Sequence, residues 1–220
     1  MTDTKRARVT LTDAAREFLR HPTPWLLATA RLAAVAARVA VGDWRWSDAL
    51  LPFVVLALFP LFEWMIHVLV LHWKPRRIAG FTVDPVLARK HREHHVDPRI
   101  VKLIFIPLQS LAGALVSTLF VAFVLIPRSG LGLTFLVVIF TIGLVYEWTH
   151  YLVHTDYKAK TAFYRMIWRN HRLHHFKNEH YWFGVSTPGT ADRVLGTYPD
   201  PQSVPTSPTA KNLHGRRVSA

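Results

Sequence analysis

Histidine is the residue type in this chain whose number and spacing could do chemistry. Ten of the 13 histidines fall into four tight clusters, which form two matched pairs. The clusters are His67/His72, His91/His94/His95, His150/His154 and His171/His174/His175. Neutral imidazole is the commonest metal ligand in proteins. Clusters of this kind, beside apolar runs long enough to cross a bilayer, predict a polyhistidine metal centre at a membrane surface.

The spacing within each cluster suits a metal ion. His150 and His154, at i and i+4, lie on one helical face about 5–6 Å apart, so both rings can reach one ion. In H-x-x-H-H the three histidines lie at i, i+3 and i+4 and so share a face, and the adjacent pair diverges by about 100°, so its members can serve different ions. His67 and His72, at i and i+5, do not share a face of an ideal helix. We expect the helix to end or distort there, or the two to bind different ions.

The size of the histidine set favours two ions. Zinc takes about four ligands and iron about five or six, so ten imidazoles exceed what one ion needs. We expect one or two of the ten not to ligate. His67 and His150 are 83 positions apart, and His91 and His171 are 80 apart. The chain therefore resembles a parallel repeat, with a two-metal site where its halves meet.

Glu63 and Glu147 lie about one turn before His67 and His150. An ionisable residue at the membrane end of a helix is costly and usually functional. We expect each carboxylate to support the centre by accepting the far N–H of a ligating imidazole. The alternative is a carboxylate that snorkels to the membrane surface.

The chain contains no cysteine. This excludes iron–sulfur clusters, thiolate-ligated haem, disulfides and cysteine zinc sites. Haem held by two histidines would leave the adjacent pairs unexplained. Residues 1–20 carry charge without an apolar stretch and cleavage site, so no signal peptide is expected.

Apolar stretches predict an all-α integral membrane protein with four transmembrane helices. A spanning helix needs roughly 20 mostly apolar residues. The predicted spans cover residues 24–41, 49–71, 103–126 and 131–153. The first contains Arg31 and Arg38 on one face, so the alternative for it is an amphipathic helix in the interface. Residues 1–23 form a basic N-terminal segment, residues 24–199 the membrane domain, and residues 200–220 a proline-rich tail expected to be disordered.

The distribution of positive charge predicts the topology. Residues 1–24 carry five Lys and Arg, residues 73–102 carry eight and residues 155–220 carry ten. With four spans these segments share one side, which the positive-inside rule makes the cytoplasm. The termini and a helical cap with the di-metal site are then cytoplasmic, in a bacterial inner membrane or the endoplasmic reticulum. The net charge of +13 is explained by this loop pattern, and no nucleic-acid partner is expected.

At these residues the chain resembles the fatty acid hydroxylase/sterol desaturase superfamily of membrane di-iron enzymes. The resemblance covers about residues 50–199 and rests on four ordered motifs: H-x4-H, H-x2-H-H, H-x3-H and H-x2-H-H. The stretches 183–188 (FGVSTP) and 192–197 (DRVLGT) resemble the fatty acid 2-hydroxylase branch. Carotene hydroxylases share the histidine pattern, but the H-x3-H spacing and this ending fit the acyl-lipid branch better.

The resemblance implies that the histidines of these four clusters hold two iron ions, Fe2+/Fe3+, which Zn2+ can replace during purification. It implies an O2-dependent hydroxylase of a fatty acyl chain, with two electrons from a separate donor such as a ferredoxin, or a cytochrome b5-like protein with its reductase. His180, outside the clusters, would be a supporting residue. The alternatives are a desaturase or a carotenoid or sterol hydroxylase of the same superfamily, and a zinc-dependent membrane hydrolase or metal-binding membrane protein.

Overall fold

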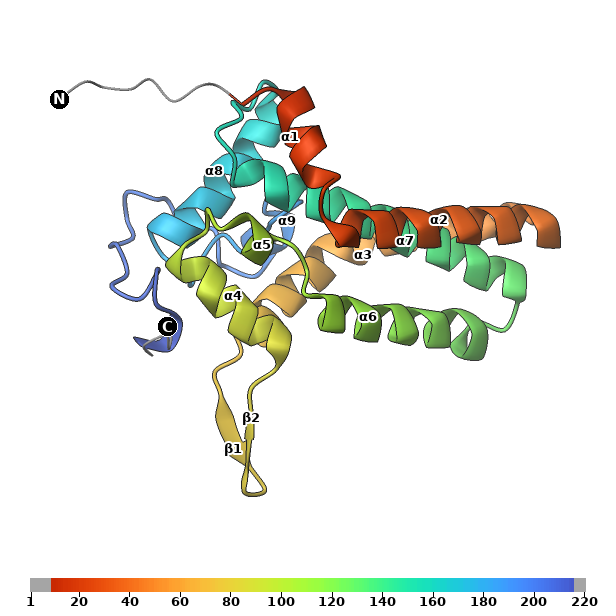
Figure 1. The fold of residues 1–220 in the computed structure, drawn as a ribbon, viewed down its shortest axis with the longest axis horizontal. Helices are drawn as coiled ribbons and strands as arrows, with labels where there is room; N and C mark the ends of the chain where they lie inside the picture. Colours follow the sequence, from red (N-terminus) through yellow and green to blue (C-terminus); the bar gives the residue numbers. More distant parts are fainter. Residues whose placement is uncertain (1–8, 216–220) are drawn as a thin grey trace.

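The computed structural model describes residues 9–215 and has long apolar helices at one end and a smaller helical cap at the other (Figure 1). Four helical segments are long and apolar enough to cross a membrane: Pro22–Val41, Trp46–Leu71, Val101–Leu125 and Ser129–Val153. Each end lies within three residues of the predicted one. The expected four-span membrane fold is therefore confirmed.

The spans are built from helices α2 (Pro22–Val41), α3 (Leu50–Ile66), α6 (Leu108–Phe120) and α7 (Ser129–Val153). A short helical turn, η1 (Trp46–Ala49), leads into α3. The third span is interrupted, because a separate turn, α5 (Val101–Ile104), precedes the non-helical residues 105–107. Proline lacks an N–H and disfavours helix in the residue before it, so the helix restarts after Pro107.

Two spans end in a wider helical turn with i→i+5 hydrogen bonds. These π-helical turns are η2 (His67–Leu71), which continues α3, and η3 (Val121–Leu125), which continues α6. In η2 the backbone N–H of His72 donates to the carbonyl oxygen of His67 at 3.0 Å. This bond places His72 one wide turn beyond His67 and on the same side of the helix. The expected distortion is present, and π-turns of this kind are frequent at functional sites.

The cap consists of short helices outside the spans. These are α1 (Leu11–Phe18), α4 (Val86–Val96), α8 (Ala162–Phe176), α9 (Thr190–Val194) and the turn η4 (Leu213–Gly215). The two H-x-x-H-H motifs lie on α4 and α8. The side chain of Thr161 caps α8 by accepting from the N–H of Tyr164, which fixes where that helix begins.

One element departs from the expected all-helical cap. Strands β1 (Arg76–Ile78) and β2 (Phe81–Val83) form an antiparallel hairpin between η2 and α4. Its turn contains Ala79 and Gly80, both with positive φ. Two strands of three residues are too short to show as a hydrophobic periodicity in a sequence.

The two arginines of the first span are paired with the helix beside it. Arg31 donates to Thr141 and Arg38 to Thr134, both at 2.9 Å and both on α7. Arg38 also forms ion pairs at 3.0 Å with Asp43 and Asp48 at the end of the bundle far from the cap. These contacts explain how α2 tolerates two charges, since a buried charge needs a partner.

The tail is ordered where a disordered segment was expected. Residues 200–215 pack against the cap, and Val204, Ala210 and Leu213 are buried. The N–H of Ser207 donates to the carbonyl oxygen of Lys177 at 2.7 Å. The small number of apolar residues in the tail predicted disorder. Three buried apolar side chains suffice to order it here, because the tail packs on the surface of the folded cap and does not need a core of its own. Residues 216–220 lie outside the described part.

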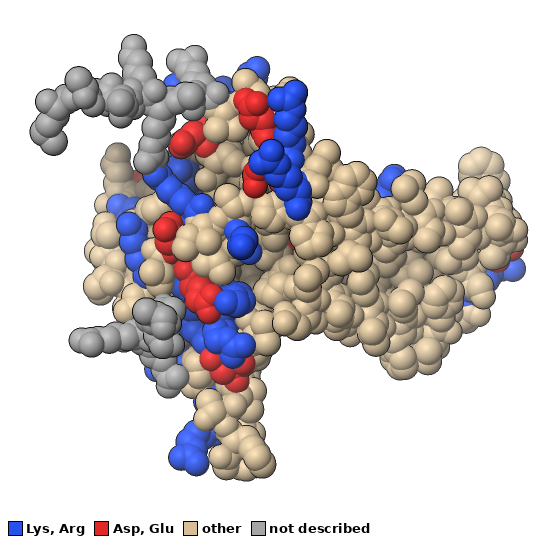
Figure 2. Space-filling model, viewed as in Figure 1, with Lys and Arg blue, Asp and Glu red and all other residues tan. Residues whose placement is uncertain are grey.

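Apolar contacts fix the spans to one another and to the cap. One buried cluster joins α2, α6 and α7 through residues such as Leu27, Leu111 and Phe140, and a second joins α1, α5 and α7. Figure 2 shows most charged side chains gathered over the cap and at the far ends of the spans, with a largely uncharged surface between them that has basic atoms at its upper edge. That largely uncharged band is the surface expected to face lipid.

Candidate metal centre

All ten histidines of the four clusters converge where the spans meet the cap, and they form two groups of five. The first group is His67, His72, His91, His95 and His174. The second group is His94, His150, His154, His171 and His175. Within each group, one ring nitrogen from every residue lies within 4.8 Å of the others. Each group therefore offers five nitrogen atoms around a common point.

The two H-x-x-H-H helices divide their histidines between the groups. On α4, His91 and His95 belong to the first group and His94 to the second; on α8, His171 and His175 belong to the second and His174 to the first. The i and i+4 members stay together, and the middle histidine diverges, as the helical angles predict.

Backbone carbonyls orient three imidazoles of the first group. The Nδ1 atoms of His67, His95 and His174 donate to the carbonyl oxygens of Phe183, Ala210 and Tyr181 at 2.6, 2.9 and 2.8 Å. A carbonyl oxygen only accepts, so the proton must be on Nδ1. In a neutral imidazole the Nε2 lone pair is then free. The tail supplies one of these carbonyls, at Ala210.

Free ring nitrogens point into the groups at short distances from one another. The Nε2 atom of His174 lies 3.2 Å from that of His72, and Nε2 of His95 lies 3.1 Å from that of His91. In the second group the Nε2 atoms of His154 and His171 are 2.9 Å apart. Nitrogen lone pairs gathered this closely are arranged to share a cation.

The imidazoles are neutral, which is the form that binds metal. Burial, followed by the neighbouring imidazoles, holds the pKa of His91, His94, His171 and His175 well below the usual range for histidine. Burial lowers the pKa of His95 to about 3. The buried Nε2 atom of His67 has no hydrogen-bond partner among the described residues. Neutral, buried and unpartnered nitrogens fit two metal ions.

Neither glutamate contacts an imidazole, which corrects the expected role of Glu63 and Glu147. Glu63 accepts from the N–H and hydroxyl of Ser186 and from the hydroxyl of Thr187, at 2.5–2.7 Å. Glu147 accepts from the hydroxyl of Thr23 and the N–H of Ile106, at 2.7 and 2.8 Å. Residues one turn apart lie on one helical face, but donors from other segments of the chain occupy both carboxylates here.

The glutamates instead hold the segments that surround the centre. Glu63 fixes residues 186–187, and Asp192 fixes the preceding residues by accepting from the N–H groups of Phe183 and Gly184, both at 2.9 Å. Together they position the Phe183 carbonyl that orients His67. Glu147 ties α7 to the start of α2 and to the break before α6. In the sequence, residues 183–188 and 192–197 stood out by their resemblance to the fatty acid 2-hydroxylase branch, but that resemblance gave Phe183 and Asp192 no role.

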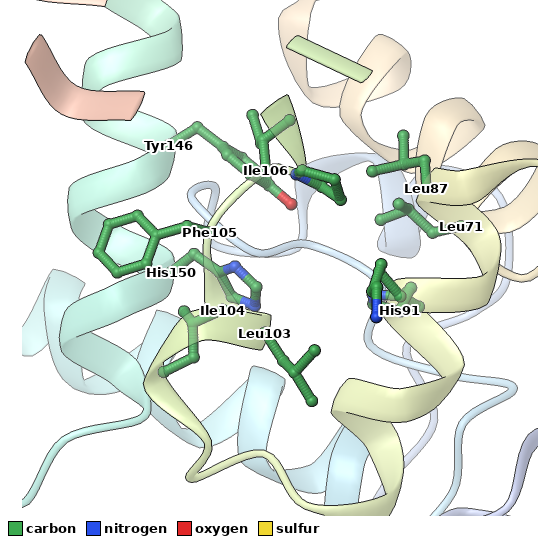
Figure 3. Close-up of a pocket in the computed structure, with 11 residues that line it drawn as sticks. Leu71, Leu87, His91, Leu103, Ile104, Phe105, Ile106, Tyr146 and His150 are labelled. Atoms are coloured by element: carbon green, nitrogen blue, oxygen red, sulfur yellow. The ribbon is translucent and has the colours of Figure 1, made fainter. Parts of the chain in front are cut away.

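An apolar cavity lies beside the two groups. It is a small cavity of about 30 Å³ between the end of η2, α4, residues 103–107 and α7. His91 of the first group and His150 of the second approach it from opposite sides, and Tyr146 lines it on α7 (Figure 3). The other lining side chains are Leu71, Leu87, Leu103, Ile104, Phe105, Ile106 and Pro107, together with Lys90.

Comparison with known proteins agrees with this geometry. A family model described as fatty acid hydroxylase matches residues 52–197. The chain belongs to the fatty acid hydroxylase family. The match begins in the second span and ends at Thr197, so it includes all ten histidines and the segment that carries Phe183 and Asp192. The hydroxylase family accounts for the order of the four motifs and for the ending that resembled its acyl-lipid branch.

A solved structure shares the fold of this chain. It is titled "Full length scs7p (only hydroxylase domain visible)", and it is 23% identical over 84% of this chain and 69% of that one, with a TM-score of 0.66. At this identity the similarity shows a common fold. No curated protein matches the chain.

The backbone carbonyls that orient the imidazoles gave no usable signal in the sequence. The carbonyls of Tyr181, Phe183 and Ala210 belong to the backbone, which any residue can supply. Phe183 also places its ring 5.3–5.5 Å from the rings of His67, His72 and His174, so it shields the first group. His180, expected as a supporting residue, has a side chain that is 70% exposed and lies 3.6 Å from Glu179.

Proposed function

We propose that this hydroxylase inserts one oxygen atom from O2 into a C–H bond of a fatty acyl chain, at a centre of two iron ions. Membership of the fatty acid hydroxylase family supports a lipid substrate. Ten imidazoles in two groups of five, with no thiolate in the chain, support iron, which takes five or six ligands more readily than zinc. The ending that resembles the fatty acid 2-hydroxylase branch supports a carbon near the headgroup as the target.

The cavity in Figure 3 is the observation that carries this proposal. It is lined by one histidine from each group, His91 and His150, and its other lining side chains are apolar except Lys90 and Tyr146. An acyl chain entering between the spans would therefore meet both groups beside mostly apolar side chains. A dry, shaped wall is what the protein must supply when a metal performs the oxidation.

The chain's own residues would hold and orient the metal ions. The five nitrogens of each group would bind one ion, and the carbonyls of Phe183, Tyr181 and Ala210 keep the ligating tautomer of three imidazoles. When bound, iron would supply the reduction of O2 with two external electrons and two protons, giving a hydroxylated chain and water. Tyr146 and the apolar residues around it would fix which carbon faces the centre.

The surface charge suits the headgroup and the electron donor. Lys90 lines the cavity with a side chain that is 42% exposed and paired with Glu93 at 2.6 Å. Its ammonium group can meet a carboxylate or phosphate headgroup at the membrane surface. Lys and Arg are spread over the cap (Figure 2), which suits an acidic redox partner such as a ferredoxin or a cytochrome b5-like protein on the cytoplasmic side.

The test is lipid analysis of cells that express the protein or its His91→Ala/His150→Ala variant under 18O2. The proposal predicts a hydroxylated lipid that carries 18O and depends on both histidines. A new double bond without 18O would identify a desaturase. A product that forms without O2, or in protein with zinc and no iron, would identify a hydrolase and contradict the proposal.

A further inference from the structure

The hairpin β1–β2 projects from the body of the protein near the point where the spans meet the cap (Figure 1). It follows the end of the second span at Leu71 after four residues. It runs roughly at right angles to the four spans, near the boundary between their apolar surface and the cap (Figure 1). If the spans cross a bilayer, the hairpin therefore extends along its surface.

The two faces of the hairpin differ in character. The pairs Arg76–Val83 and Ile78–Phe81 share one face, and the pair Arg77–Thr82 lies on the other, because side chains alternate along a strand. Phe81 is 77% exposed and Ile78 is 49% exposed. Figure 2 shows basic side chains on the outer edge of the hairpin and uncharged ones on the edge toward the spans.

The base of the hairpin is held firmly, so its direction is fixed. The indole N–H of Trp73 donates to the carbonyl oxygen of Val83 at 3.2 Å. Arg92, on α4, donates to both carboxylate oxygens of Asp84 at 2.8 and 2.7 Å, and to the carbonyl oxygen of Trp73 at 3.1 Å. The hairpin is thus attached to the helix that carries His91, His94 and His95.

An isolated two-stranded hairpin is marginally stable in water, and this one exposes its two largest apolar side chains. Aromatic side chains and arginine are the residue types that settle at a membrane interface. The guanidinium of Arg76 lies 5.0 Å from the centre of the Trp73 ring, and Lys74 and Arg77 are close by in the chain. Each basic residue near an anionic leaflet adds about 1 kcal/mol of attraction.

We propose that this hairpin is an interfacial anchor that lies on the bilayer crossed by the spans. Ile78 and Phe81 enter the boundary between headgroups and acyl chains, and Arg76 and Arg77 contact anionic headgroups. Through Arg92 the anchor sets how α4 and the cavity beside it sit relative to the membrane surface.

The experiment uses single cysteines, since the chain has none. Ile78→Cys and its matched control on the opposite face, Thr82→Cys, are labelled with a nitrobenzoxadiazole dye in the full-length protein. The protein is placed in nanodiscs of phosphatidylcholine, with or without phosphatidylglycerol. We expect doxyl-labelled lipid to quench the dye at position 78 at least about threefold more than at position 82, and iodide to show the reverse order.

Further variants separate the two parts of the proposal. Phe81→Ser should reduce lipid quenching at position 78, whereas Phe81→Leu should preserve it. Arg76→Glu/Arg77→Glu should reduce it mainly in discs that contain phosphatidylglycerol. Equal access of iodide to both positions would mean that the hairpin stands in water. Protection of position 78 from iodide without quenching by doxyl lipid would mean that a protein covers it. Either result overturns the anchor.

Discussion

His94 and His174, the middle histidines of α4 and α8, are exchanged between the two groups: each belongs to the group that the other half of the chain otherwise supplies. The Nε2 atom of His94 lies 3.1 Å from that of His154, and Nε2 of His174 lies 3.2 Å from that of His72. The first group therefore contains four histidines from the first half and one from the second, and the second group the reverse. Neither half can complete its group alone, so the two sites depend on the same contact between α4 and α8.

This exchange predicts which site each substitution damages. His174→Ala removes a nitrogen from the group with His67 and His72, although His174 is adjacent in sequence to His175 of the other group. We expect His174→Ala and His94→Ala each to lower the metal content from about two ions per chain to about one and to abolish product formation. Metal analysis of purified protein at matched expression gives the first quantity, and hydroxylated lipid gives the second.

His180→Ala is the control, because that imidazole is largely exposed and belongs to neither group. It should keep both ions. Two ions and full activity in His94→Ala or His174→Ala would show that the histidine groups are not the catalytic centre.

The sequence predicted the parts of this structure that repeat a simple physical rule. The length of the apolar stretches predicted the four spans. The angle of about 100° between adjacent helical residues predicted that His94 and His95 can serve different groups. The i, i+5 spacing of His67 and His72 predicted a distorted helix, although it left open whether the two share a group. The ordered tail and the partners of Glu63 could not be predicted, because they depend on which distant backbone lies nearby in the fold.

Removing the tail should weaken the first group. The carbonyl oxygen of Ala210 accepts from Nδ1 of His95 at 2.9 Å and so holds its Nε2 lone pair toward the group. A chain that stops after Pro205 should bind its metal about 10–100-fold more weakly, the usual effect of losing a partner that orients a ligand. Competition with a chelator measures this. A chain that stops after Gly215 keeps Ala210 and should behave like the full-length protein; equal loss in both would contradict the role of Ala210.

Glu63 and Glu147 should differ in what their loss affects. Glu63→Gln disturbs three hydrogen bonds to Ser186 and Thr187, next to the Phe183 carbonyl that orients His67. We expect metal affinity or activity to fall by roughly 10–100-fold. Glu147→Gln disturbs contacts to Thr23 and Ile106, at the wall of the cavity, so activity should fall while the metal content stays near wild type. An equal fall in metal content in both variants would refute this division.

The ion pairs at the end far from the cap should stabilise the bundle. Arg38 is 3% exposed and pairs with Asp43 and Asp48, and Arg128 pairs with the same two carboxylates. Removing one partner of a buried pair typically costs about 3–5 kcal/mol, so Arg38→Ala should lower the unfolding temperature markedly in detergent. Arg45→Ala, an exposed arginine in the same connection, should change it little. Equal unfolding temperatures for Arg38→Ala and wild type would show that the pairs contribute nothing.

The last prediction concerns the sides of the membrane. Both H-x-x-H-H helices and the ordered tail lie at the cap end, whereas Ser129 begins α7 at the opposite end. In the sequence, segments 1–24, 73–102 and 155–220 carry 23 of the 27 Lys and Arg, so the positive-inside rule places the side that they share in the cytoplasm. Single cysteines at the exposed positions Ser129 and Ser203 test this in intact cells with a membrane-impermeant maleimide. The cysteine at position 129 should react before lysis, and the cysteine at position 203 only afterwards. The reverse order would place the histidine groups outside the cytoplasm, and with them the proposed electron donor.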